Sequence, residues 1–196
     1  MQELTSFLAD IGFSSLYGVN IEKLPSRIAR SVVLYFDKET YELSLEKGKI
    51  LVTCEKIHEI LGVPLGGINF IELPERSLDD PFVMLWLKQF SPKKWKKIHA
   101  SDVAGKLITA TQVDFMFRVN FLTLFANVMG KAHTMRAIVD LTIVRRITKD
   151  INIAKIDWCG FIHHCLQYSD IPNTPKGFYN GALCFLIVSF FFFFYL

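Results

Sequence analysis

The sequence predicts a mainly α-helical, irregular domain with one small β-hairpin at about residues 41–52. Two observations predict the helices. Apolar residues recur at intervals of three and four along most segments, and helix-capping residues precede several of them. A third observation predicts the hairpin, because apolar and polar residues alternate there with the two-residue period of a strand. With 196 residues, no internal repeat and no long Ser/Gly/Pro linker, the chain is expected to form one domain.

The first two helices are predicted from their apolar spacing. Residues 4–19 indicate a short amphipathic helix that ends near Gly12, followed by a second short turn. Ser26 is a candidate N-cap for the next helix, because its hydroxyl can accept a hydrogen bond from a free amide of the first turn. The buried face of this helix is expected to contain Ile28, Val32, Val33 and either Tyr35 or Phe36.

The hairpin and the helix after it follow from local signals. The segment 46–49, Glu-Lys-Gly-Lys, supplies a turn between two alternating runs. Thr53 is expected to cap a helix over residues 54–61, and Gly62 followed by Pro64 ends it. Apolar residues of the two strands are Tyr41, Leu43, Leu45, Ile50 and Val52.

The middle of the chain begins with a loop over residues 62–77 that contains a short strand. Asp80 is then expected to cap a helix whose first residue is Pro81, because proline is well suited to that position. Its apolar stripe is predicted to contain Phe82, Leu85, Trp86 and Phe90. Another helix is expected to begin at Ser101.

The longest apolar segment of the body runs from a cap at Thr111 to Gly130. It contains four polar residues, so it is expected to be a core helix and not a membrane span. Two further helices are predicted within residues 137–147 and 156–166, and Asp157 is expected to cap the second. The four polar residues are Asp114, Arg118, Asn120 and Asn127.

Composition excludes few functions. The formal net charge of +3 is too small by itself to indicate a nucleic-acid-binding protein. The four cysteines lack the dense, regular spacing of a secreted disulfide scaffold, and the first residues lack a basic leader region. Reduced thiols in the cytosol or nucleus are therefore expected.

Residues 12–67 resemble the opening of the plant mobile domain, also called the aminotransferase-like plant mobile domain. The resemblance is carried by the Gly-Phe start, a Leu-Pro step, the Phe-Asp pair before an alternating hairpin, and Ile-Leu-Gly-Val-Pro-Leu-Gly-Gly at residues 60–67. It continues more weakly to about Leu183. The later segments are most similar to plant transposon-associated proteins in which this region precedes a SUMO-specific (ubiquitin-like) cysteine protease domain.

The resemblance implies a plant source, a mobile-element history and nuclear localisation. Despite the family's name it does not imply transamination, because no lysine here has the context of a pyridoxal-phosphate anchor and no Gly-rich phosphate loop is present. The His, Asp and Cys of a protease domain would lie beyond residue 196. No enzymatic activity, cofactor or metal is therefore expected of this chain.

One charge cluster stands out as a candidate contact site. Lys93, Lys94, Lys96 and Lys97 surround Trp95, and we call these five residues the basic loop. Three interpretations stay open: a solvated loop with Trp95 folded back on the core, a nuclear-import signal, or a nucleic-acid contact in which lysines meet phosphates and the indole stacks on a base.

Cysteine and histidine also recur at helical spacing. Cys54 and His58 are four residues apart, as are Cys159 and His163, so each pair can share one helix face. Two thiolates and two imidazoles would be an acceptable zinc set, but the sequence lacks the usual Cys-x-x-Cys knuckle. A catalytic Cys159–His163 pair would need an orienting third group, and Asp157 is better used as a helix cap. We expect these residues to serve packing.

The C-terminal segment contains five consecutive phenylalanines, Phe190–Phe194. The uncharged run from residue 181 would span about 24 Å as a helix, short of the ~30 Å hydrocarbon core of a bilayer. Because Val188-Ser189 can be encoded by a splice-donor sequence and the rest by T-rich codons, we hypothesise that residues 188–196 translate a retained intron. The predicted domain is then residues 1–187, truncated at its C-terminus. Exposed phenylalanines would lower solubility.

The sequence thus favours a non-enzymatic interaction or scaffold module of transposable-element origin. It is expected to be nuclear, with an unidentified protein partner or with nucleic acid as partner through the basic loop. The first alternative is the accessory region of a SUMO-specific-type protease whose catalytic domain is missing. The second is a small membrane protein anchored by its tail.

Overall fold

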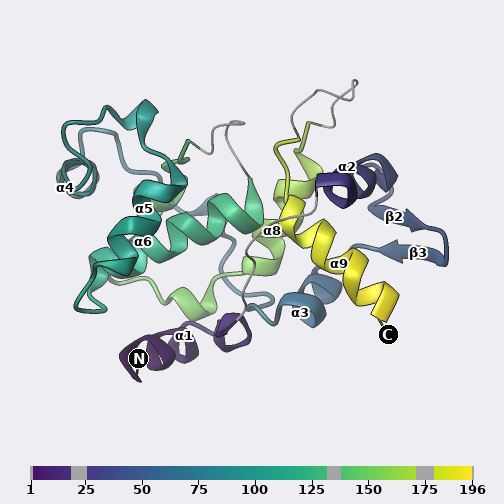
Figure 1. The fold of residues 1–196 in the computed structure, drawn as a ribbon. Helices are drawn as coiled ribbons and strands as arrows, with labels where there is room; N and C mark the ends of the chain where they lie inside the picture. The colour runs from purple at the N-terminus through teal and green to yellow at the C-terminus, as the bar shows by residue number, and fades with distance from the viewer. Residues whose placement is uncertain (1, 19–25, 132–137, 171–178, 196) are drawn as a thin grey trace.

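The apolar faces predicted from the sequence come together around one core in the computed structural model, which describes residues 2–18, 26–131, 138–170 and 179–195. The structure is mainly helical with a small antiparallel sheet at one end (Figure 1). Helices α4 and α5 lie at the opposite end from this sheet, and α8 lies between the two ends (Figure 1).

The N-terminal third contains two helices, a short turn and the sheet. Its elements are α1 (Gln2–Asp10), the 3-10 turn η1 (Ser14–Leu16), α2 (Ser26–Tyr35), β1 (Phe36–Asp37), β2 (Glu42–Leu45) and β3 (Gly48–Leu51). The sheet has three strands in the order β1-β2-β3, so the predicted hairpin is correct but incomplete. Phe36 pairs with Leu43, which in turn pairs with Ile50. Of the two residues predicted as alternatives for the buried face, Phe36 is therefore the buried one, and Tyr35 is exposed.

Ser26 is the first residue of α2 and not the residue that precedes it. Its side chain, which was expected to cap the helix, lies outside the described residues. The next cap is confirmed. α3 (Cys54–Leu61) begins after Thr53, whose side chain accepts a hydrogen bond from the amide of Lys56, and it ends at Gly62 with a left-handed φ of 64°.

The middle of the chain reaches the end of the molecule opposite the sheet with α4 and α5 (Figure 1). Its elements are η2 (Phe70–Glu72), α4 (Pro81–Lys88), η3 (Trp95–Lys97), α5 (Ala100–Ile108), α6 (Phe115–Phe125) and the π-helical turn η4 (Ala126–Gly130). The turns η2 and η4 contact α8 in the centre. The cap by Asp80 is confirmed. The helix expected to begin at Ser101 is present as α5 and begins one residue earlier, at Ala100. The expected cap at Thr111 is wrong, because α6 starts after Asp114.

The apolar stripe of α4 differs from the prediction at one position. Val83 and Trp86 are fully buried, whereas Leu85 is 54% exposed. The orientation of α4 is set by Trp86, whose indole Nε1 donates a 2.7 Å hydrogen bond to Oδ1 of Asn120 on α6. This hydrogen bond also explains how a polar residue is accommodated in a core helix, because a buried amide needs a partner.

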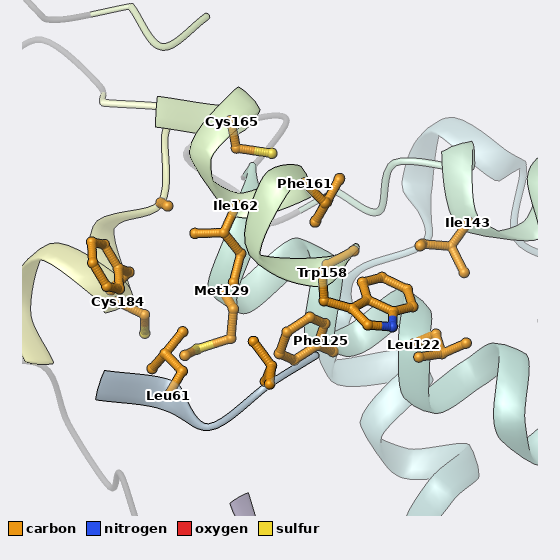
Figure 2. Packing of buried hydrophobic residues seen from close by; sticks show 14 of the residues in the cluster. Leu61, Leu122, Phe125, Met129, Ile143, Trp158, Phe161, Ile162, Cys165 and Cys184 are labelled. Atoms are coloured by element: carbon orange, nitrogen blue, oxygen red, sulfur yellow. The ribbon is translucent and has the colours of Figure 1, made fainter. Parts of the chain in front are cut away.

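The C-terminal third supplies the centre of the core. Its elements are α7 (Thr142–Arg146), η5 (Ile153–Lys155), α8 (Trp158–Gln167) and α9 (Leu183–Tyr195). Figure 2 shows Trp158 among Leu122, Phe125 and Ile143, with Cys184 of α9 further along the same core. Asp157 caps α8 as predicted, since its side chain accepts from the amide of Gly160.

The phenylalanine-rich segment is part of α9, and this helix contacts α2, α3 and η4. Ser189 is fully buried, and Phe190 and Phe191 are partly buried against the core. The expectation that the phenylalanines are exposed is wrong for Phe190, Phe191 and Phe192; the side chains of Phe193 and Phe194 lie outside the described residues. In the part of the chain that the structure describes, no helix is long and apolar enough to cross a membrane.

Candidate interaction surface

The basic loop is an exposed bridge between two buried anchors. Phe90 at the end of α4 is 6% exposed and Ile98 before α5 is fully buried. Every residue from Ser91 to Lys97 between these anchors is exposed. Ile98 is fixed further because its carbonyl accepts a 3.0 Å hydrogen bond from the amide of Val139. The loop is therefore held at both ends while its side chains face solvent.

Trp95 lies at the surface and not in the core. Its side chain is 37% exposed, whereas Trp86 and Trp158 are fully buried. The 3-10 turn η3 places Nζ of Lys96 5.1 Å from the centroid of the Trp95 ring, a cation–π contact. Trp95 is therefore not a core residue, although most of its surface is covered by the chain. The loop therefore presents an accessible aromatic ring beside positive charge.

The four lysines differ in their partners. Lys93 donates a 2.6 Å charge-assisted hydrogen bond to Oδ1 of Asp102 on α5. The pKa of Asp102 is lowered, first by the backbone amide of His99 and then by this lysine. Lys94 and Lys97 form no ion pair with any described residue. Their charge is therefore available to an anionic partner.

A shallow polar groove continues this surface. Lys93 and Lys106 both line it, together with Gln89, Ser101 and Thr109. Lys106 is exposed and lies one helical turn after Asp102, on the same face of α5. Lys106 lies outside the cluster of consecutive lysines and was not predicted as part of this surface. Recognition of the cap formed by His99 and Asp102 would have fixed the register of α5 and shown that Lys106 faces the basic loop.

The cysteine and histidine residues considered as zinc ligands are used in packing. The thiol of Cys159 donates to the carbonyl of Val63 at 3.3 Å, and Nδ1 of His58 contacts the same carbonyl oxygen at 2.7 Å. The ring of His163 stacks on Tyr41 with 4.3 Å between centroids. Among the described residues, no group of three or more potential ligands could hold a metal ion.

The Cys159–His163 pair lacks the electrostatics of a nucleophile and its base. Burial raises the pKa of Cys159 to about 12, and burial also lowers the pKa of His163. Both groups are therefore neutral near pH 7, whereas an activated thiol needs a lowered pKa. Asp157 is occupied as a cap, because its Oδ1 accepts from the amides of Gly160 and Gly66.

The chain belongs to a family described as a domain of unknown function, DUF8566, whose model matches residues 2–187. No curated protein matches the chain, and no solved structure matches it.

Proposed function

We propose that the chain is a non-enzymatic interaction module whose basic loop contacts a single-stranded nucleic acid. The observation that carries this proposal is the simultaneous exposure of Trp95 and of the lysines around it on a loop anchored at both ends. Lysines neutralise phosphates, and an exposed aromatic ring stacks on a base without regard to sequence. An anchored loop loses less conformational entropy on binding than a free tail does.

A single-stranded partner fits the surface better than a duplex. The loop presents one exposed ring and no long helix that could enter a major groove. Bases in a duplex are stacked on one another, so an indole has access to their faces only in single strands or loops. The groove between Lys93 and Lys106 extends this surface; Asp102, which pairs with Lys93, also lines it, so Lys106 is the cation that the groove adds for a phosphate.

The test is the binding of a fluorescein-labelled oligothymidylate of about twelve nucleotides, a length within the usual site size, followed by fluorescence anisotropy. Changing Lys94, Lys96 and Lys97 to Ala should weaken binding strongly. Trp95→Ala should weaken it by about 1–3 kcal/mol, the value of one stacked base.

A matched control removes the same charge from the other end of the molecule. Lys47, Lys49 and Lys56 lie around the hairpin and α3, far from α4 and α5 (Figure 1). Lys49 and Lys56 form surface ion pairs with Glu42 and Glu59, so their loss should cost little stability. Equal weakening by the two triple variants would show that only net charge matters and would overturn the proposal.

The nuclear location and the transposable-element origin belong to the same proposal, and they rest on the resemblance to the plant mobile domain. A fluorescent fusion of the full chain in plant cells tests the location. Loss of nuclear signal when the four lysines of the basic loop become Ala would favour the import interpretation of that loop.

The alternative function is that of an accessory region in front of a SUMO-specific-type cysteine protease domain. The same resemblance supports it, and it requires a catalytic His, Asp and Cys downstream in the full-length gene product. A downstream genomic read that contains no such domain would remove this alternative.

A further inference from the structure

A cavity separate from the basic loop lies between α7, α8 and the π-helical turn η4. Its volume is about 170 Å³. The cavity is partly open to solvent, so a ligand can enter it from the surface. An apolar cavity of about 150 Å³ is known to accept one benzene molecule. The cavity can therefore hold one small ring.

The floor of the cavity is apolar and rigid. Phe70 and Phe161 meet edge to face with 5.1 Å between ring centroids, and both pack on Trp158. Ile143 of α7 closes the floor from the other side. Phe161 and Cys165 project from the same face of α8 (Figure 2). These side chains are locked in the core, so a bound ring would find a preformed surface.

One wall of the cavity is polar, and its polar groups already form hydrogen bonds with other groups of the chain. The side chain of Asn127 donates to the carbonyl of Thr123 at 2.8 Å and accepts from the amide of Asp140 at 3.1 Å. The carboxylate of Asp140 accepts from the amide and the hydroxyl of Thr142. Both of these hydrogen bonds end on Oδ1 of Asp140, so this oxygen is engaged by donors from its own chain.

The remaining polar groups in the lining are Lys131 and His164. Nζ of Lys131 donates one long hydrogen bond, 3.5 Å, to the carbonyl of Tyr168. An ammonium has three donors, and in the described part of the chain it forms no ion pair. The pKa of His164 is lowered, first by burial and then by the charge of Lys131. Lys131 is thus a positive charge with donors to spare beside a neutral imidazole.

We propose that this cavity binds a small aromatic carboxylate, with its ring on Phe70, Phe161 and Ile143 and its acidic group against Lys131 and His164. The apolar floor selects the ring, and the ammonium of Lys131 selects an acid over an amine. This site does not depend on the proposed nucleic-acid surface, and either can fail without the other.

The experiment is 19F NMR titration of the full chain with 4-fluorobenzoate, with 4-fluorobenzylamine as the probe of opposite charge. Fluorobenzoate should bind more tightly than fluorobenzylamine. Lys131→Met keeps the aliphatic stem, removes the charge and should weaken fluorobenzoate binding by about tenfold or more, as loss of a charge-assisted hydrogen bond does. Ala126→Leu adds bulk to the lining and should abolish binding of both probes.

Lys88→Met is the matched control, because it removes the same charge from an exposed site that lies outside both the cavity and the basic loop. It should leave fluorobenzoate binding unchanged. Since Ala126→Leu can perturb folding, its far-UV circular dichroism is compared with that of the wild type, and Lys131→Met provides an independent test. No binding of fluorobenzoate at millimolar concentration, equal binding of the amine, or an unchanged Lys131→Met variant would each overturn the proposal.

Discussion

Asn120 offers the sharpest test of the helical core, because it places a polar amide among buried apolar side chains. It is 4% exposed, and it accepts a 2.7 Å hydrogen bond from the indole of Trp86, which is fully buried. Its Nδ2 also donates to Oε1 of Gln89 at 3.0 Å. Asn120→Ala therefore leaves the indole N–H without a partner in a place that water does not reach.

The expected loss follows from these contacts. A buried donor without a partner costs about 1–3 kcal/mol. Alanine returns about 0.5 kcal/mol, because it is the better helix former. Asn120→Ala should therefore lower the free energy of unfolding by about 0.5–2.5 kcal/mol, measured by urea denaturation followed by far-UV circular dichroism.

The control is a double-mutant cycle with Trp86→Phe, which removes the donor itself. In that background Asn120→Ala should cost less, with a coupling free energy of about 1 kcal/mol between the two positions. A cost of Asn120→Ala below about 0.5 kcal/mol, the range of ordinary surface changes, would refute this account of how α4 packs on α6. A double-mutant cycle that shows no coupling between the two positions would also refute it.

Three further predictions concern the buried thiols, the glycines and the tail. Burial raises the pKa of Cys159 and Cys165 from 9.0 to about 12, so the unfolded chain loses these two protons at a lower pH than the folded chain does. The free energy of unfolding should therefore fall above pH 9 by about 1.4 kcal/mol per pH unit for each thiol. Cys159→Ala should flatten this slope; an unchanged slope would contradict the burial. Gly67→Ala should lower the free energy of unfolding by about 2–3 kcal/mol, since φ is +106° and a Cβ would lie 2.2 Å from a backbone carbonyl oxygen. Gly105→Ala should raise it by about 0.5–1 kcal/mol, because Gly105 is helical and has open space around it. Chemical denaturation of both variants measures the contrast. Deletion of residues 188–196 should lower both the melting temperature and the soluble yield, because Ser189 and the partly buried phenylalanines pack on the core. The retained-intron hypothesis predicts instead that the soluble yield rises.

Local signals could be predicted from the sequence because their physics is local. Thr53, Asp80 and Asp157 cap their helices as expected, since a cap needs only a side-chain oxygen and an amide two or three residues later. The same reasoning failed at Thr111, where Asp114 is an equally good cap and the choice depends on how the chain leaves α5.

Tertiary contacts could not be predicted in the same way. Leu85 and Val83 are both apolar, and the orientation of α4 is decided by the distant hydrogen bond between Trp86 and Asn120. β1 has only two residues, too few for a visible alternation, and it forms because Phe36 meets the hairpin.

The two candidate sites differ in the same way, because one is local in the sequence and the other depends on tertiary contacts. The basic loop was found from the sequence because its residues are consecutive, although the exposure of Trp95 was not decided there. The cavity between α7, α8 and η4 is lined by two or three residues from each of η2, η4, α7 and α8, so no continuous motif marks it.

The most direct measurement of the central claim is the salt dependence of oligothymidylate binding. For single strands, log K falls by about 0.7 per unit of log[salt] for each neutralised phosphate. Lys94, Lys96 and Lys97 make no ion pair with any described carboxylate, so the wild-type slope should be about −2 and should approach zero when all three become Ala. A wild-type slope near zero, or a triple variant with an unchanged slope, would contradict the claim that this loop is the contact surface.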